Sequence, residues 1–213
     1  MNMIASVGPS GGAIGIDKEP RMIAHAHRTI TERALSNVKL ALGEASHTGL
    51  ASRSFDLAHE RLVLINHPDP QDVVAEMARV VRPGGWVALQ EVDCELWRCE
   101  PRHDAWDELH LAFLESFDAA GRDPYVGRRL PALLRQAGLT DVDFDVHACH
   151  WGPGHPYQTL LLYFTELLRE HILEAGLLTV DRLDGLEAEL ERHLARPDTF
   201  VIHPLFFQAW ARR

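Results

Sequence analysis

Two carboxylates stand directly after short apolar segments of the sequence. Asp17 ends the segment 12–17, and Glu44 follows the segment 38–43 and precedes Ala45. A carboxylate at the tip of a buried strand can accept hydrogen bonds from a ribose hydroxyl pair, or it can cap the helix that follows. A carboxylate followed by a backbone N–H can pair with adenine, or it can be a solvated loop residue. Both interpretations stay open for each segment.

Histidine offers acid–base chemistry at one loop position. His67 lies in the loop after the segment 55–59, and a histidine side chain can take a proton from a hydroxyl group. It can equally be a loop histidine without a catalytic role. We predict no metal site at His147, Cys149 and His150. Alternation along a strand puts His147 and Cys149 on one face and His150 on the other, and the four-ligand spacing of a zinc site is absent.

The glycine-rich segment 8–12 resembles a nucleotide-binding loop in composition only. Such a loop lies between a preceding strand and a following helix. Here seven residues precede Gly8 and a strand follows. We therefore interpret 8–12 as the turn that leads into the strand ending at Asp17, and 2–7 as the end of a helix.

The elements that position these residues alternate between strand and helix. Helices are predicted from Pro20 to about Leu35 and from Pro70 to Val81, and Pro83-Gly84 fits the centre of a type II turn. Apolar runs predict strands at 12–17, 38–43, 55–59 and 86–91. This order predicts parallel pairing with right-handed crossovers in an α/β fold.

Beyond residue 100 the pattern becomes mainly helical. We predict helices at about 103–120, 126–137, 157–175 and 179–195, a strand at 142–149 and one strand-like segment at 199–210. The chain is predicted to be a single domain, 1–213, with helical cap and substrate segments at about 94–137 and 150–198. Seven aromatic residues of these segments form either the core of the cap or a lid over an apolar acceptor: Trp97, Trp106, Phe113, Phe117, Tyr157, Tyr163 and Phe164.

Several segments in series carry a family resemblance. They are VGPSGGAIGIDKEPRMI, VKLALGEASHTGLASRSFDLAHERLVLINHPDP and EMARVVRPGGWVALQEVD. Together they resemble class I S-adenosylmethionine-dependent methyltransferases, in the small-molecule branch similar to ubiquinone/menaquinone-biosynthesis methyltransferases. The resemblance covers residues 7–93 continuously, and the segments around 139–148 and 199–211 suit the family's closing hairpin.

The resemblance implies a Rossmann-like methyltransferase sheet, mostly parallel with an antiparallel last strand, and S-adenosyl-L-methionine as cofactor. It implies that Asp17 binds the ribose hydroxyls, with Lys18 beside it in the same loop. Glu44 takes the adenine-amino role, where the family more often has Asp, and the Ala45 N–H donates to the adenine ring. His59 lies close to the methionine part of the cofactor.

One part of the family pattern is absent. The family begins with a strand, a Gly-rich loop and a helix that hold the methionine half of the cofactor. This sequence begins at what resembles the end of that helix. The resemblance therefore implies truncation before the Gly-rich motif, with the first strand missing between the strands that end at Asp17 and His59.

Composition limits the classes of binding partner and the cellular compartment that we expect for this protein. A net charge of −10 and a pI of about 5.7 argue against a nucleic-acid-binding surface. No apolar run approaches the ~20 residues of a membrane span, and no secretory signal opens the sequence. Three cysteines without paired spacing favour free thiols and a cytoplasmic location.

The predicted function is methyl transfer to a small organic acceptor, with His67 as the candidate catalytic residue. The alternative is a degenerate, non-catalytic methyltransferase-like protein that acts as a binding or partner subunit. A nicotinamide oxidoreductase is less favoured, since it also needs the Gly-rich loop and leaves the closing hairpin unexplained.

Overall fold

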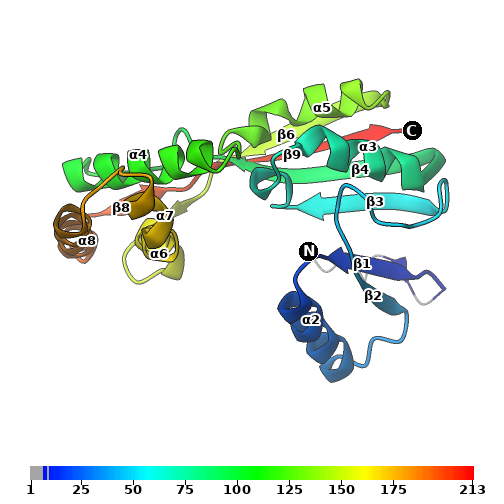
Figure 1. Ribbon diagram of the computed structural model, residues 1–213, viewed down its shortest axis with the longest axis horizontal. Helices are drawn as coiled ribbons and strands as arrows, with labels where there is room; N and C mark the ends of the chain where they lie inside the picture. The colour runs from blue at the N-terminus through cyan, green and yellow to red at the C-terminus, as the bar shows by residue number, and fades with distance from the viewer. Residues whose placement is uncertain (1–6, 9) are drawn as a thin grey trace.

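The parallel strands form two separate pairs, as Figure 1 shows. The computed structural model describes residues 7–8 and 10–213, so most of the predicted helix end at 2–7 lies outside the described residues. β1 (Ala13–Asp17) pairs in parallel with β2 (Val38–Leu42). β3 (Phe55–Arg61) pairs in parallel with β4 (Val81–Asp93). Among the described residues, no strand joins β1 to β3.

The helix α2 (Pro20–Glu32) connects the two strands of the first pair, β1 and β2. Pro20 occupies the first turn, where the missing N–H costs no hydrogen bond. The helix ends at Glu32, earlier than predicted. Of the segment 8–12, Gly8 and residues 10–12 are described, and the Asn37 side chain donates to the carbonyls of Gly8 and Gly11 at 3.2 and 3.0 Å. The segment precedes a strand, as the sequence predicts.

β3, α3 (Pro70–Val80) and β4 form the second parallel unit. α3 is amphipathic and buries its apolar side chains, among them Val73, Val74 and Met77. β4 is longer than predicted at both ends. Its register with β3 shifts at the Pro83-Gly84 bulge, where Gly84 has a φ of +79°. This left-handed conformation favours glycine and fits the predicted turn.

The four-stranded sheet is completed by two antiparallel strands in the order β3-β4-β9-β6. β9 (Leu205–Arg212) runs antiparallel to both β4 and β6 (Thr140–His147). The sheet is therefore mixed, with the antiparallel last strand that the family resemblance implies. η2 (Val126–Arg129) and α5 (Leu130–Gln136) precede β6, and α5 contacts α3, β6 and β9.

The predicted single strand at 199–210 is wrong. It divides into β8 (Phe200–Ile202) and β9, which lie in different sheets. β8 pairs antiparallel with β5 (Arg98–Glu100) and β7 (His150–Trp151), two strands that were not predicted. Pro204 lies between β8 and β9 and lacks the N–H that a continuous ladder needs.

Helices pack around this small sheet to form the cap. α4 (Asp104–Ala119) packs against α8 (Val180–Leu194), whose bounds are close to prediction. The predicted helix at 157–175 is broken into three pieces, η3 (Pro156–Thr159), α6 (Leu160–Leu167) and α7 (Arg169–Glu174). No helix in the described part of the chain is long and apolar enough to span a membrane.

Candidate functional site

Asp17 stands at the carboxyl end of β1, beside the end of β2. Its backbone carbonyl accepts a hydrogen bond from the Gly43 amide at 3.0 Å. Its side-chain Oδ1 accepts from the Glu19 amide at 2.8 Å. Glu19, not Asp17, occupies the N-cap position of α2. The helix-cap interpretation of Asp17 is therefore wrong, and its half-exposed carboxylate lies at the edge of the sheet.

Glu44 and Ala45 begin the loop that follows β2. Glu44 is exposed, and its carbonyl accepts a hydrogen bond from the His47 amide at 3.1 Å. Ala45 is half-buried and packs against the hydrophobic core. Lys18 is exposed in the loop after β1. The paired ends of β1 and β2 thus bring Asp17, Lys18, Glu44 and Ala45 to one edge of their sheet.

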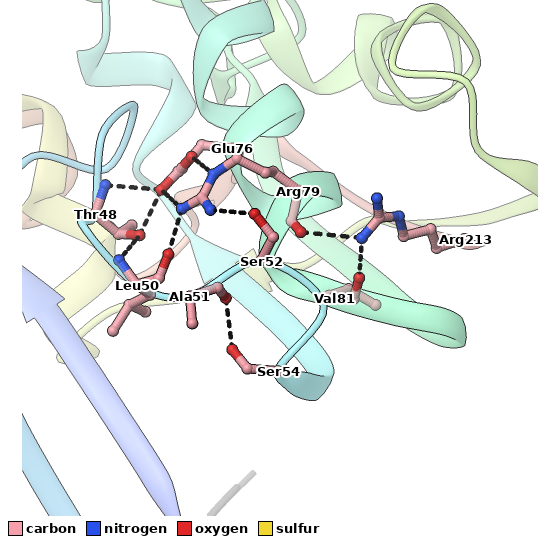
Figure 2. A network of polar contacts seen from close by, with 9 residues as sticks. All are labelled: Thr48, Leu50, Ala51, Ser52, Ser54, Glu76, Arg79, Val81 and Arg213. Carbon is pink, nitrogen blue, oxygen red and sulfur yellow. Dashed lines mark hydrogen bonds and ion pairs between the residues drawn. The ribbon is translucent and has the colours of Figure 1, made fainter.

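A polar network holds the connection between β2 and β3 on α3 (Figure 2). Thr48 donates to Glu76 Oε1 from its amide at 2.8 Å and from its hydroxyl at 2.5 Å. Arg79 donates to the Leu50 carbonyl at 2.6 Å and to the Ser52 hydroxyl at 2.7 Å. Hydrogen bonds from Arg79 and Thr48 lower the pKa of Glu76 to about 2. An ionised Glu76 therefore anchors this crossover.

The carboxyl end of β3 carries His59 and Glu60. His59 is exposed, and partial burial of its ring, with a contribution from the charge of Arg61, lowers its pKa. Glu60 is only 7% exposed. Its carboxyl group accepts hydrogen bonds from the amides of Val63 and Gln90, at 3.2 and 3.1 Å.

Glu91 lies beside Glu60 and is fully buried in β4. Its Oε1 accepts from the amides of Leu64 and Ile65 at 2.5 and 3.3 Å, whereas no described residue donates a hydrogen bond to its buried Oε2. Sequence reasoning missed both carboxyls. A signal existed for Glu91, because alternation along β4 places it on the same face as the buried Val87 and Leu89.

His67 follows η1 (Leu64–Asn66) and is half-buried. Its Nδ1 lies 3.1 Å from the Asp69 amide and accepts a hydrogen bond from it. In this arrangement the neutral ring carries its proton on Nε2. His67 therefore has a role in the turn before α3, and it presents a donor rather than an acceptor at Nε2.

A second feature that the sequence did not reveal lies at the end of β4. The Arg128 guanidinium pairs with the buried Asp93 through Nε and Nη2, and also contacts Glu95. The Tyr125 ring lies beneath the same guanidinium, 5.2 Å from its centre. This pair fixes η2 against the carboxyl end of β4.

The aromatic residues of the cap are divided between core and surface. Trp97, Trp106 and Phe113 are buried, and the Trp97 ring contacts the other two edge to face at 5.7 and 5.5 Å. These residues therefore belong to the core. Tyr157 and Tyr163 are about half or more exposed, at 50% and 61%.

The predicted site residues form two groups. Asp17, Lys18, Glu44 and Ala45 lie at the ends of β1 and β2, whereas His59 and His67 lie at and beyond the end of β3. Within the described residues, no hydrogen bond or ion pair joins the two groups. An open depression of about 540 Å³ lies elsewhere, on the cap, and none of the predicted site residues lines it.

A known protein family matches more than half of the chain. The family described as methyltransferase domain matches residues 1–120. The demethylmenaquinone methyltransferase of Geobacillus sp. (strain WCH70) is 40% identical over 171 residues, covering 69% of this chain and 70% of that protein. The arsenite methyltransferase of Halobacterium salinarum is 37% identical over 86 residues, which is 40% of this chain but only 22% of that protein.

A solved structure supports the same fold. The YcgJ protein of Bacillus subtilis superposes with a TM-score of 0.59 at 17% identity, covering 95% of this chain and 82% of that one. At this level of identity the likeness concerns the fold alone.

Proposed function

This chain belongs to the class I methyltransferases, and from that premise we propose that it transfers a methyl group from S-adenosylmethionine to a small organic acceptor. The observation that carries the proposal is the match of residues 1–120 to the methyltransferase domain. The cofactor supplies an electrophilic methyl group on a sulfonium. The protein then has to align the acceptor with that group and exclude water.

The edge formed by β1 and β2 suits the adenosine half of the cofactor. Asp17 is half-exposed beside the end of β2, so its carboxylate is available to a ribose hydroxyl pair. Lys18 lies next to it in the same loop. Glu44 is exposed and stands one residue beyond Gly43, so it can accept from the adenine amino group while the Ala45 N–H donates to the ring. Sites of this kind lie at the carboxyl ends of parallel strands.

We propose that one further strand pairs between β1 and β3 and brings the Gly-rich loop for the methionine half. Parallel strands are normally buried on both faces. Here the side chains of Ile14 in β1 and Leu57 in β3 are 39% and 49% exposed. A strand in this place, with its loop and helix, would cover them and bring the cofactor's methionine part close to His59.

For an acceptor that must lose a proton, we propose His67 as the base. Its position after β3 lies on the side of the sheet where the acceptor would enter. To take a proton, the ring has to exchange its hydrogen bond with the Asp69 amide or adopt the other tautomer. An acceptor that reacts without losing a proton needs no such step.

Composition and connectivity support proposals on the domain organisation, the acceptor-selecting segments, the partners and the cellular location. We treat 1–213 as one domain, with the segments at about 94–137 and 150–198 selecting the acceptor. The acidic charge disfavours a nucleic acid partner, and we propose no membrane partner. The cysteines Cys94, Cys99 and Cys149 are all free thiols, which supports a cytoplasmic location.

Transfer of a labelled methyl group tests the proposal. The chain, preceded by an added strand, Gly-rich loop and helix of the kind that the family resemblance implies, is incubated with methyl-labelled S-adenosylmethionine and a cell extract. We expect label in the solvent-extractable small-molecule fraction, and less of it in Asp17→Ala at the same cofactor concentration. Label confined to precipitated protein or nucleic acid contradicts the small-molecule acceptor.

A further inference from the structure

Two buried carboxyl groups lie near the carboxyl ends of β3 and β4. Glu60 is 7% exposed and Glu91 is fully buried, and both accept hydrogen bonds from amides of the turn that connects β3 to η1. Two carboxyl groups that share a buried site repel each other unless one of them carries a proton. Burial also penalises the charged form of each group.

The hydrogen bonds around the pair leave one place for that proton. Both oxygens of Glu60 accept from backbone amides, and Oε1 of Glu91 accepts from Leu64 and Ile65. Oε2 of Glu91 is buried, and no N–H or O–H group of the described residues donates to it. A shared proton satisfies this oxygen, and the proton belongs to the pair rather than to either residue.

Three of the four amides that the pair binds belong to a single turn, and the fourth is that of Gln90 in β4. Val63, Leu64 and Ile65 lie in the segment that connects β3 to η1 and His67. Leu62 opens the turn with a φ of +56°, a conformation that is unfavourable for a branched side chain. Such a conformation persists only where the surroundings impose it, and here the two carboxyls supply the acceptors.

We propose that Glu60 and Glu91 hold a single proton between them and, as positioning residues, fix the turn 62–66 that places His67 at the mouth of the site. The role of the pair in catalysis rests on the proposed methyl transfer. The shared proton and the stabilisation of the turn are independent of that function.

The other described ionisable groups near the pair do not supply a positive charge that would neutralise the two carboxyls in place of this proton. Within the described chain, no arginine, lysine or histidine forms an ion pair with either carboxyl. Asp93 is held by Arg128. The Cys94 thiol is buried, which raises its pKa and keeps it neutral. His59 and Arg61 flank Glu60 along β3, and their side chains are exposed.

Loss of the proton has a defined consequence. Burial raises the pKa of Glu91 to about 7, and burial together with Glu91 raises that of Glu60 well above its usual value. The folded state therefore keeps protons that the unfolded chain has lost. The stabilisation is complete below the unfolded pKa of about 4.5 and falls as pH rises through about 7. Above that range two adjacent negative charges loosen the turn.

Glu91→Gln is the variant that separates this proposal from a simple packing role. The amide oxygen keeps the bonds from Leu64 and Ile65, and the NH₂ group donates to Glu60 where the proton would be. We expect the melting temperature of the unchanged protein to fall between pH 6 and pH 8.5, and that of Glu91→Gln to change much less. Glu115→Gln, an exposed position on α4, is the control and should retain the full pH dependence.

Two spectroscopic measurements complete the test and need neither cofactor nor acceptor. At pH 6 the infrared spectrum should contain a protonated carboxyl band that is absent in Glu91→Gln. Amide exchange at Leu64 and Ile65, corrected for intrinsic base catalysis, should lose protection between pH 6 and pH 8.5 in the unchanged protein only. No protonated band, or equal protection profiles in both proteins, would overturn the proposal. If these results hold while methyl transfer fails, the proposed function is wrong and the proton pair stands.

Discussion

Glu76 accepts two hydrogen bonds from Arg79 one turn later on α3, at 2.6 Å from Nε and 2.8 Å from Nη2. The same arginine and Thr48 attach the crossover 48–52 to the helix (Figure 2). We predict that Glu76→Gln lowers the free energy of unfolding at pH 7 by about 1–3 kcal/mol, because hydrogen bonds to a charged group are lost. Denaturant unfolding measures this change.

The pH dependence of this effect has the opposite sign to that of Glu60 and Glu91. The pKa of Glu76 is lowered to about 2, so its stabilisation is complete above about 4.5 and is lost as pH falls through about 2. The difference between the unchanged protein and Glu76→Gln should therefore shrink towards low pH. Glu189→Gln, exposed on α8, is the control. A difference that stays constant from pH 7 to pH 3 would contradict an ionised anchor.

Gly127 makes a close backbone contact that predicts a packing defect. A Cβ at this position would lie 2.8 Å from the Val92 carbonyl and 3.1 Å from the Phe207 ring. Gly127→Ala should therefore lower the free energy of unfolding by about 1–3 kcal/mol through overpacking. Gly185→Ala is the matched control, since it meets open space within α8 and should stabilise by about 1 kcal/mol. Equal effects at both glycines would contradict this packing.

Elements with a strong local pattern could be predicted from the sequence. α3 is one example, because Pro70 begins it and Val73, Val74 and Met77 recur on one face. The division between β8 and β9 could not be predicted, since both flanks are apolar and the choice of sheet depends on distant partners. β5 and β7 have three and two residues, so they form only because β8 lies between them.

The candidate site was predicted unevenly for a similar reason. Asp17 and Glu44 follow apolar runs, and strand pairing brings them to one edge, as expected. Glu60 was missed because a single carboxylate in a strand carries no local sign of its partner, Glu91, 31 positions away. The bond from the Asp69 amide to His67 is local, yet side-chain orientation decides it, and sequence spacing does not contain that information.

His67 has two separable roles, in the turn and in catalysis. If it is the base, His67→Ala should lower turnover by about 10²-fold and leave cofactor affinity intact. His67→Asn preserves a side-chain acceptor for the Asp69 amide but cannot take a proton near neutrality. We therefore predict a similar loss of turnover in both variants. Full activity of His67→Asn across pH 6–9 would show that His67 does not transfer a proton. Its role would then be only structural, in the turn before α3.

Within the described residues, β1 and β3 each have one edge that pairs with no strand, which predicts a stability gain from one added strand. Backbone groups buried without partners cost about 1–3 kcal/mol each, and open edges recruit other chains. The 213-residue chain alone should melt with low cooperativity or aggregate. Adding a strand, Gly-rich loop and helix of the kind that the family resemblance implies should give a cooperative melt and less light scattering. A flexible Gly/Ser segment of equal length is the control, and equal improvement by that segment would contradict strand pairing.

Titration calorimetry of S-adenosylmethionine into the strand-completed chain tests the assigned cofactor site directly. We predict micromolar binding, and binding weaker by about 1–3 kcal/mol in Asp17→Ala because a hydrogen-bonded carboxylate is lost. The melting temperature of Asp17→Ala without ligand should change little. Glu19→Ala, a neighbouring exposed carboxylate in the same loop, should bind like the unchanged protein. Unchanged affinity in Asp17→Ala would contradict the ribose-binding role of Asp17, and micromolar binding by the 213-residue chain without the added strand would contradict the need for that strand.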